Sequence, residues 1–465
     1  MDNKDTIFNG FLVNGGISVP VRVSYASRFS VFVSFTENIK PVHGTDYEKL
    51  ILSIESRDFE FSSCRILLET NSDPYAARLV FLNDLFDFKN LFFEQKLINL
   101  ETLSKNLSLI LSQKENVKET FKNYITELAY DIKVYQQFFD DLDRKCANEP
   151  EQVREVIFNA IVNSEGKKFE AFYEEKLNEL EQLIAGYTNE EHRLHGFYLR
   201  KQMWDIILRS EFMARTNIKP RGYAGDSVMM RMLYENAYCG DSTFARILNK
   251  FGLNVPAAQS VRNRRVMISK ILRQVQQKFA DRNVKTLRIM SVACGPAFEL
   301  SDLFITADDT MRFQCTLLDQ DPEALGEAEE NIHRIEAAFG HSIQAIYLQD
   351  SVRTMLRTPD IHNKWGRFHF IYSMGLFDYL TQPVAKAVIE KIYSLLEPGG
   401  SMFIGNYHVQ NRSRWFMEYW LDWVLYYRTE EDMIELIRDT DAEAVSILFE
   451  ESGCQMFLST HKPLK

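Results

Sequence analysis

The alternation of apolar and polar residues near the start of the chain predicts β-strands. Residues 17–25 and 29–35 both alternate with a period of two, and Gly15-Gly16 precedes the first of these stretches. Shorter strands are predicted at residues 50–55, 59–69 and 77–81. A meander of this kind closes most simply as a small antiparallel barrel or sandwich.

From about residue 92 to residue 282 the apolar period becomes helical. Apolar residues recur at helical spacing along 100–111 and 117–142, which predicts two long helices packed as a hairpin, with a dimerising coiled coil as the alternative. Further helices are predicted at 167–186 and 192–214. Pro220 and two glycines interrupt the pattern over 219–226, so this stretch is expected to be a turn between helices.

Strand-like and helical stretches alternate from residue 287 onward. Short apolar strands that alternate with helices indicate a parallel sheet covered on both faces. The predicted strands are 287–292, 313–318, 343–348, 368–373 and 401–405. The last two strands, 444–450 and 455–461, are separated by only four residues and must form a hairpin. The predicted sheet therefore has five parallel strands and one terminal hairpin that brings in an antiparallel strand.

Composition narrows the classes of protein that fit. A hydrophobic content of 45% supports packed cores, and a net charge of −11 disfavours nucleic-acid partners. No uncharged apolar run approaches the roughly 18 residues of a membrane span, and no signal peptide is visible. The six cysteines are scattered without metal-ligand spacing, so we expect no metal, no disulfide framework and a reducing cytoplasm.

The predicted strand ends carry the residues with the strongest chemical signal. Ligands of doubly wound sheets bind outside the carboxyl ends of the strands. Small residues after the first strand let a ligand approach the backbone, and Pro296 suits the first turn of the next helix. The residues predicted to bind a cofactor in this loop are Ser291, Ala293, Cys294, Gly295, Pro296 and Glu299. A purely structural tight turn is the alternative.

Acidic residues end the second and third strands. Asp319, followed by Gln320, is placed to accept hydrogen bonds from both ribose hydroxyls, whereas Asp321 is expected to cap a helix. Asp350, with Ser351, can accept from an adenine amino group, and capping of a helix at 352–357 is the alternative. Ser373, Met374 and Gly375 follow the fourth strand and form a wall beside the reacting sulfonium.

These features, in this order, predict a class I methyltransferase sheet that binds S-adenosylmethionine (SAM). A dehydrogenase would need a G-x-G-x-x-G loop and a sixth parallel strand. The predicted fold class is thus a multidomain α/β protein with a class I methyltransferase, Rossmann-like sheet. The predicted domains are a β barrel at 1–90, a helical domain capping the active site at 91–285, and the methyltransferase at 286–465.

Five segments between about residues 190 and 430 resemble bacterial methyltransferases of 3-hydroxypalmitic acid methyl ester biosynthesis, which make a quorum signal. They are 219–226, 261–265, 294–299, 375–380, and 421–423 together with 426–429. The resemblance implies SAM as cofactor and carboxyl O-methylation of a small, partly apolar acid such as a hydroxy fatty acid. The alternatives are a regulatory protein with a ligand-sensing barrel and a weak transferase, or a protein or RNA methyltransferase.

The N-terminal barrel resembles a degenerate PilZ domain. PilZ receptors of cyclic di-GMP carry an Arg-x-x-x-Arg motif, whereas Arg22 and Arg28 lie six residues apart here. The second expected motif, (Asp/Asn)-x-Ser-x-x-Gly, survives only as residues 60–65, where Glu60 replaces the Asp or Asn and Arg65 replaces the glycine. A structural or docking barrel is therefore predicted.

Candidate catalytic residues follow from the chemistry of methyl transfer. A carboxylate acceptor is already anionic, whereas a phenol or amine needs a general base. The catalytic candidates are Tyr223, Arg221, Asp226, Tyr379 and His408. Arg221 or Arg428 could orient a carboxylate, although Arg221 and Asp226 could instead pair within their turn. The aromatic stretch 415–427 either packs against the helices or lines an apolar pocket, and a homodimer through the helical region is considered.

Overall fold

The computed structural model describes residues 8–26, 30–36, 39–54, 57–68, 74–82, 84–85, 98–99 and 111–464. It contains two compact units, Met1–Asn116 and Val117–Lys465, which have separate hydrophobic cores. The predicted division of the second unit near residue 285 stays a prediction.

The N-terminal unit contains a closed six-stranded antiparallel barrel, which confirms the predicted barrel. Its strands are β1 (Phe8–Asn14), β2 (Ile17–Ala26), β3 (Ser30–Phe35), β4 (Asp46–Ile54), β5 (Arg57–Leu67) and β6 (Ala76–Phe81), in the order β1-β2-β3-β6-β5-β4. Because β1 pairs with both β2 and β4, the ring has no open edge. A short pair, β7 (Asp84–Leu85) and β8 (Ile98–Asn99), follows.

Only part of the comparison with a PilZ domain falls on described residues. Arg22 lies in β2, and Arg28 lies outside the described residues. Residues 60–65 lie within β5, where Arg65 makes two hydrogen bonds of 2.6 and 2.8 Å to Asp46 of β4. Arg65, the last residue of the degenerate motif, is therefore already paired with a residue of the neighbouring strand.

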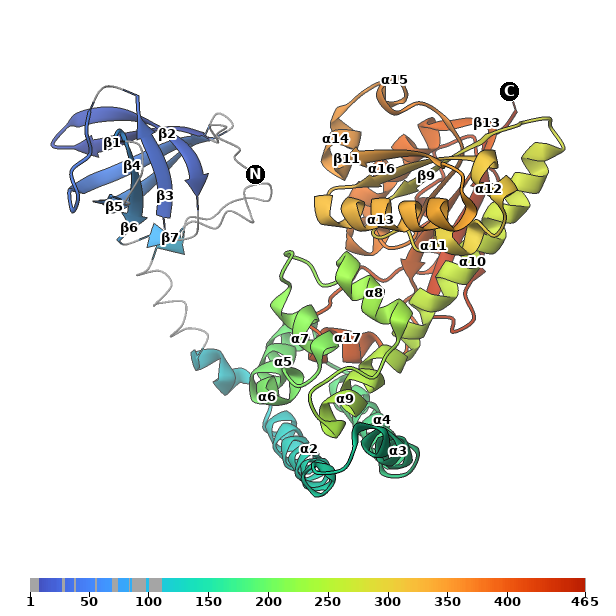
Figure 1. The fold of residues 1–465 in the computed structure, drawn as a ribbon, viewed down its shortest axis with the longest axis horizontal. Coiled ribbons are helices and arrows are strands. Elements are labelled where there is room, and N and C mark those ends of the chain that lie inside the picture. The colour runs from blue at the N-terminus through green and yellow to red at the C-terminus, as the bar shows by residue number, and fades with distance from the viewer. Residues whose placement is uncertain are drawn as a thin grey trace. The chain divides into compact units, whose positions relative to one another are not determined.

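Helices form the first part of the second unit (Figure 1). They are α2 (Glu119–Cys146), α3 (Glu151–Ile161), the π-helix η3 (Val162–Gly166), α4 (Lys167–Ile184), α5 (Asn189–Gln202), α6 (Trp204–Ile207), α7 (Glu211–Ile218), α8 (Ser227–Glu235), α9 (Thr243–Asn254) and α10 (Pro256–Ala280). Residues 100–110, the predicted partner of α2, lie outside the described residues, so the helical hairpin and the homodimer stay predictions. No described helix has the length and apolarity needed to span a bilayer.

The predicted helix 192–214 is wrong in one respect, because the chain forms three helices there. The first break lies at Met203, whose backbone leaves the helical range. The second lies before Ser210, whose side chain accepts from the Met213 N–H and so caps α7. The Ser210 hydroxyl also donates to Asn249, which anchors the cap on α9.

The methyltransferase sheet has seven strands in the order β11-β10-β9-β12-β13-β15-β14. Its strands are β9 (Leu287–Val292), β10 (Phe313–Asp319), β11 (Gln344–Gln349), β12 (Phe368–Ser373), β13 (Leu396–Tyr407), β14 (Glu443–Phe449) and β15 (Gln455–His461). The first five are parallel, and β15 is antiparallel to β13. This is the class I methyltransferase topology, as predicted.

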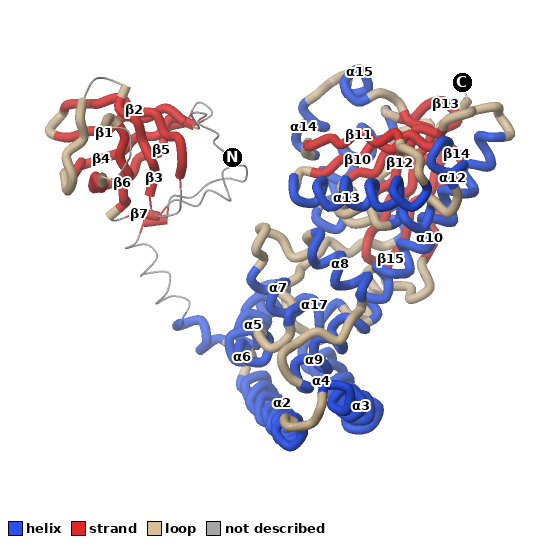
Figure 2. Tube along the Cα trace, in the orientation of Figure 1, coloured by secondary structure: helices blue, strands red, loops and turns tan. Residues whose placement is uncertain are grey.

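Helices cover both faces of the sheet because its strands are apolar on both sides (Figure 2). In β9, Ile289 belongs to one core cluster, which includes α10 and α13 (Pro322–Phe339), and Met290 belongs to the opposite cluster. The second cluster includes α14 (Val352–Arg357), α15 (Ile361–Trp365) and α16 (Gln382–Ser394). Shorter helices on the same unit are α11 (Glu299–Leu303), α12 (Ala307–Arg312) and α18 (Glu430–Glu435).

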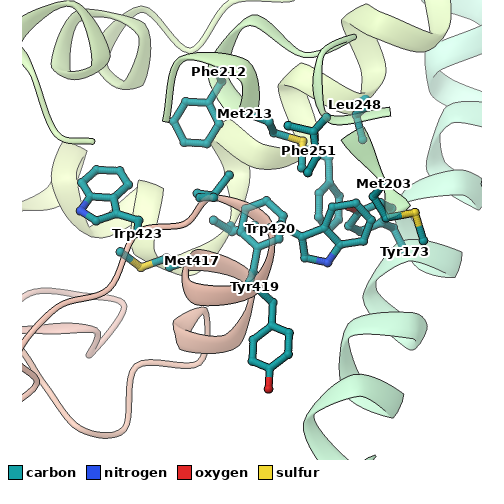
Figure 3. Packing of buried hydrophobic residues seen from close by; sticks show 14 of the residues in the cluster. Tyr173, Met203, Phe212, Met213, Leu248, Phe251, Met417, Tyr419, Trp420 and Trp423 are labelled. Carbon is teal, nitrogen blue, oxygen red and sulfur yellow. The ribbon is translucent and has the colours of Figure 1, made fainter. Parts of the chain in front are cut away.

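An aromatic segment after β13 packs into the helical core. Its helix α17 (Arg414–Trp420) places Trp420 beside Tyr173 of α4, with ring centroids 5.2 Å apart (Figure 3). Tyr419 and Trp420 are almost fully buried. Packing against the helices is therefore confirmed for this part of the stretch 415–427, and it joins the helical region to the sheet in one unit.

Candidate functional site

The loop after β9 has an unusual backbone. Ala293, Gly295 and Ala297 have φ angles of 54°, 54° and 49°, in the left-handed region. Alanine in this region costs about 1–2 kcal/mol, and such strain gathers where a loop is shaped for a ligand. A Cβ built on Gly295 would meet no atom within 4 Å, so its α-carbon faces open space. Pro296 lies in the turn before α11, which begins at Glu299, so its predicted helical position is wrong.

The Asp319 carboxylate fixes this loop from the end of β10. It accepts from the Gly295 N–H at 2.9 Å and from the Asp321 N–H at 3.0 Å, and the residue is only 7% exposed. Burial raises the pKa of Asp319 above its ordinary value. Two ionised oxygens offer about four acceptor positions, so acceptor capacity remains for ribose hydroxyls. Neighbouring Gln320 is exposed.

Asp350 extends the same edge of the sheet. Its N–H donates to the Asp319 carbonyl at 3.1 Å, which joins the ends of β10 and β11. Its carboxylate accepts from Lys364 Nζ at 2.7 Å, and although burial opposes it, this bond helps to hold the pKa of Asp350 below its ordinary value. The cap of α14 is Ser351, which accepts from the Thr354 N–H. The alternative role of Asp350 as that cap is therefore wrong.

Glu299 and the end of β12 form the opposite side of the loop. The Tyr372 hydroxyl donates to the Glu299 carboxylate at 2.7 Å, and burial raises the pKa of Glu299. Ser373 is fully buried and its hydroxyl donates to the Val292 carbonyl at 2.9 Å, so it ties β12 to β9. Met374 and Gly375 follow directly. Ser291 is buried within β9 itself.

The turn 219–226 is held at both of its ends. Lys219 donates to the Asp422 carboxylate at 2.7 Å, and its own φ of 49° ends α7. Asp226 accepts two hydrogen bonds from Arg215, at 2.9 and 2.6 Å, and caps α8 through the Met229 N–H. The pairing of Arg221 with Asp226 is therefore wrong, because Arg215 takes that place. Asp226 is 1% exposed, and its bonds fix the turn.

The middle of the turn docks on the first turn of α13. Arg221 forms ion pairs with Asp321, Glu323 and Glu327 at 3.2, 2.7 and 3.2 Å. The Tyr223 hydroxyl donates to Asp321 at 3.3 Å, and burial with the nearby carboxylates raises the pKa of Tyr223. Asp321 also caps α13, as predicted. The turn thus lies over the residues that follow Asp319.

Tyr379 meets the same turn from the short 3-10 helix η4 (Phe377–Tyr379), which follows β12. Its hydroxyl accepts from Trp423 Nε1 at 2.9 Å, and a Cβ on Gly225 would come within 2.7 Å of that oxygen. The residue is 39% exposed, yet its hydroxyl is covered, and burial raises the pKa of Tyr379. Gly225 is therefore required for the turn to approach Tyr379 and Trp423.

His408 and Arg428 have other partners. His408 is 5% exposed, lies 3.0 Å from Glu430, and packs edge-on against Phe449. Arg428 donates to four acceptors around Asn406 and the end of β12, which satisfies its buried guanidinium. Within the part of the chain that the structure describes, no hydrogen bond joins His408 to the turn 219–226.

Two buried charged residues near the site were not predicted. Asp378 is 2% exposed and accepts from the Tyr407 N–H at 2.6 Å, and burial raises its pKa to about 6. Arg264 of α10 is 6% exposed and donates to the Met374 carbonyl at 2.8 Å. Both lie in segments on which the family resemblance rests, 375–380 and 261–265. That resemblance is the feature of the sequence that could have pointed to them. The described residues contain no cluster of three or more metal-ligating side chains.

No protein-family model and no curated protein matches the chain. Parts of it are similar to solved structures. A possible exported protein from Bordetella parapertussis is 15% identical, with a TM-score of 0.41, over 59% of this chain and 87% of that one. Magnesium protoporphyrin IX methyltransferase from Synechocystis PCC 6803, solved with bound SAM, is 12% identical, with a TM-score of 0.32, over 44% and 83%. The CurJ carbon methyltransferase is 14% identical, with a TM-score of 0.36, over 62% and 71%. The fold assignment rests on the strand order.

Replacing Gly295 by alanine should separate ligand binding from stability. The left-handed φ makes alanine cost about 1–2 kcal/mol of unfolding free energy, and the added methyl group enters the open space beside the loop. We expect Gly295→Ala to abolish measurable SAM binding in calorimetric titration. Gly340→Ala is the matched control, because Gly340 also has a left-handed φ and no neighbour within 4 Å but caps α13 at its far end. Equal binding by the two variants would contradict the placement of the ligand.

Asp378 should make stability depend on pH. Its folded-state pKa of about 6 exceeds the ordinary value of 3.8, so the folded protein holds a proton that the unfolded chain releases between these values. Its contribution to stability is full below about pH 4 and is lost as the pH rises through 6. Asp378→Asn lacks this ionisation, so its unfolding free energy should gain about 3 kcal/mol relative to the unsubstituted protein between pH 4 and 7. Denaturant titrations at several pH values measure this difference, and a constant difference would refute the assignment.

Proposed function

We propose that residues 117–465 form a SAM-dependent methyltransferase whose acceptor is a carboxylic acid that is small and partly apolar, such as a hydroxy fatty acid. When bound, SAM supplies an electrophilic methyl group on a sulfonium. The protein has to bind and orient both reactants and to exclude water. The topology supports the first part of this proposal, and the state of the ionisable residues supports the second.

The observation that carries the proposal is the bond between Asp319 and the strained loop after β9. One buried carboxylate holds the Gly295 N–H and keeps acceptor capacity, while the α-carbon of Gly295 faces open space. An acid at the end of the second strand, beside a close-approach glycine, fits the ribose of an adenosyl group. Asp350 lies one strand further along, where it would meet the adenine. The residues present therefore fit SAM.

The candidate bases favour an acceptor that is already ionised. Tyr223 and Tyr379 both have raised pKa values because burial disfavours the phenolate, so both stay protonated at neutral pH. His408 is committed to Glu430. A phenol or amine acceptor would need a group that takes its proton, whereas a carboxylate needs none. Carboxyl O-methylation is thus the reaction these residues suit best.

The turn 219–226 acts in this proposal as a lid over the strand ends. Arg221 and Tyr223 fix it to the first turn of α13, and Gly225 brings it against Tyr379 and Trp423. A lid held at this place excludes water from the sulfonium and positions the acceptor. Arg221 already has three carboxylate partners, so its role is to close the lid.

Removal of the Asp319 carboxylate tests cofactor binding. Asp319→Ala should weaken SAM binding by about 2–3 kcal/mol, because a buried charged acceptor is lost. It should also destabilise the protein, since the Gly295 and Asp321 N–H groups lose their acceptor. Asp309→Ala is the matched control, because that buried carboxylate accepts from two backbone N–H groups at the start of α12. Unchanged SAM affinity in a folded Asp319→Ala variant would refute the assignment.

Variants of the lid test its closure. Arg221→Ala and Tyr223→Phe should each lower methyl transfer from labelled SAM to 3-hydroxypalmitate by about a hundredfold or more, because a misplaced lid admits water and misaligns the acceptor. Their melting temperatures should stay close to that of the unsubstituted protein, since the lid is held at both ends by Lys219 and Asp226. Arg246→Ala is the control, because it removes an ion pair with Glu155 remote from the sheet. A loss of activity that follows only the folded fraction would identify a purely structural turn.

A further inference from the structure

Arg264 is a buried guanidinium whose donors are poorly satisfied. It lies in α10, within the segment 261–265, and is 6% exposed. One terminal nitrogen donates to the Met374 carbonyl at 2.8 Å, and the other lies 3.5 Å from the Met230 sulfur. The Tyr234 hydroxyl also lies within hydrogen-bonding reach of the guanidinium. Its Nε is buried without any acceptor. Burial of a charged donor without a partner costs several kcal/mol, so this arrangement needs an explanation.

Arg428 shows that this fold can satisfy a buried guanidinium. It is 3% exposed, and its nitrogens donate at 2.5–2.8 Å to four oxygen atoms. Arg264 has one comparable bond, and its hydrogen-bond acceptors are a carbonyl, an amide oxygen, a thioether and the Tyr234 hydroxyl. Burial raises the pKa values of the carboxyl groups of Glu299 and Asp378, and the charge of Arg264 acts on both groups and lowers these pKa values in part. Among the described residues, however, no carboxylate forms an ion pair with it, although a carboxylate is the usual partner of a buried arginine.

A second unpaired donor lies beside it. Gln455, at the start of β15, is 1% exposed, and its amide nitrogen has no hydrogen-bond acceptor. Its amide oxygen is 3.5 Å from the guanidinium of Arg264. Two neighbouring side chains, more than nine-tenths buried, thus both have donors without acceptors. An anion with two or more oxygen atoms could accept hydrogen bonds from both side chains.

The position of Arg264 connects this pair to the candidate site. A Cβ on Gly375 would lie 3.3 Å from the guanidinium, so glycine leaves the end of β12 close to it. The two nearest buried acids are already engaged, Glu299 with the Tyr372 hydroxyl and Asp378 with the Tyr407 N–H. Neither acid forms an ion pair with Arg264, so its guanidinium can still receive a ligand carboxylate at the carboxyl end of β12.

We propose that Arg264 binds the carboxylate of a ligand at these strand ends, assisted by the Gln455 amide. The inference rests on the proposed function, which offers two carboxylates: that of the methionyl group of SAM and that of the acceptor acid. Both are planar, two-oxygen anions that a guanidinium binds through paired hydrogen bonds. A role confined to holding the Met374 carbonyl would require only one of its five N–H groups.

The test compares ligands with and without a carboxylate on the full chain. The variants are Arg264→Gln, Arg264→Lys and, as matched control, Arg262→Gln, whose guanidinium donates to the Leu233 and Leu253 carbonyls. The probes are S-adenosylhomocysteine, 5′-methylthioadenosine, which lacks the amino-acid group, and 3-hydroxypalmitate. Calorimetric titration gives each affinity, and thermal melting gives the folded fraction.

Arg264→Gln should weaken one of the two carboxylate ligands by roughly 10- to 100-fold and leave methylthioadenosine unchanged. Loss of S-adenosylhomocysteine binding alone identifies the cofactor carboxylate as the partner, and loss of 3-hydroxypalmitate binding alone identifies that of the acceptor. Arg264→Lys should lose less affinity for the same ligand, because lysine keeps the charge but cannot form the paired hydrogen bonds. If Arg264→Gln does not fold, Arg264→Lys takes its place in the test.

Equal affinities of all probes for the folded Arg264 variants and the unsubstituted protein would overturn the inference, as would equal weakening of methylthioadenosine. Unsubstituted protein that does not bind S-adenosylhomocysteine would instead contradict the proposed function. The arm with 3-hydroxypalmitate would then still decide whether Arg264 binds a carboxylate.

Discussion

The buried carboxylate of Asp319 is the interaction on which the candidate site depends. It holds the loop after β9 through Gly295 and the start of α13 through Asp321, and Asp321 in turn receives Arg221 and Tyr223 of the lid. Loop, helix and lid therefore share one anchor at the end of β10. Burial raises the pKa of this anchor, so the protein accepts an energetic cost that a cofactor hydroxyl would offset.

The helical region and the sheet form one unit because the chain crosses between them three times. Helix α10 leads from the helical core to the sheet, and the aromatic segment after β13 returns to that core, where Trp420 packs on Tyr173. Trp423, from the same segment, meets the lid and Tyr379. The lid is thus supported by residues about 200 positions away in sequence. Packing of the aromatic segment in the helical core therefore affects the position of the lid at the strand ends.

The sequence was most informative where local pattern decides the structure. The predicted bounds of β9, β12 and β15 match the structure, because each is a short stretch rich in apolar residues next to a turn or loop. Asp319 and Asp350 could be placed because parallel strands bring their carboxyl ends to one edge. The partners of Arg221, the four acceptors of Arg428 and the isolation of Arg264 depend on contacts between distant segments, which no local pattern encodes. The break at Ser210 was missed because its cap depends partly on Asn249.

The distribution of charge at the strand ends bears on the proposed carboxylate acceptor. Asp319, Asp321 and Glu327 all lie near the first turns of α13, where the helix dipole tolerates them. Arg221 is engaged with Asp321, Glu323 and Glu327. A carboxylate entering this region would be repelled unless a separate cation received it. The guanidinium of Arg264, from α10, lies beside Met374 and Gly375 after β12, and among the described residues it forms no ion pair with a carboxylate. In the proposed function, the acids thus lie where hydroxyl and amino donors of a nucleoside would bind, and Arg264 lies where a carboxylate would bind. This separation of charge is what a site for a nucleoside and a carboxylate requires.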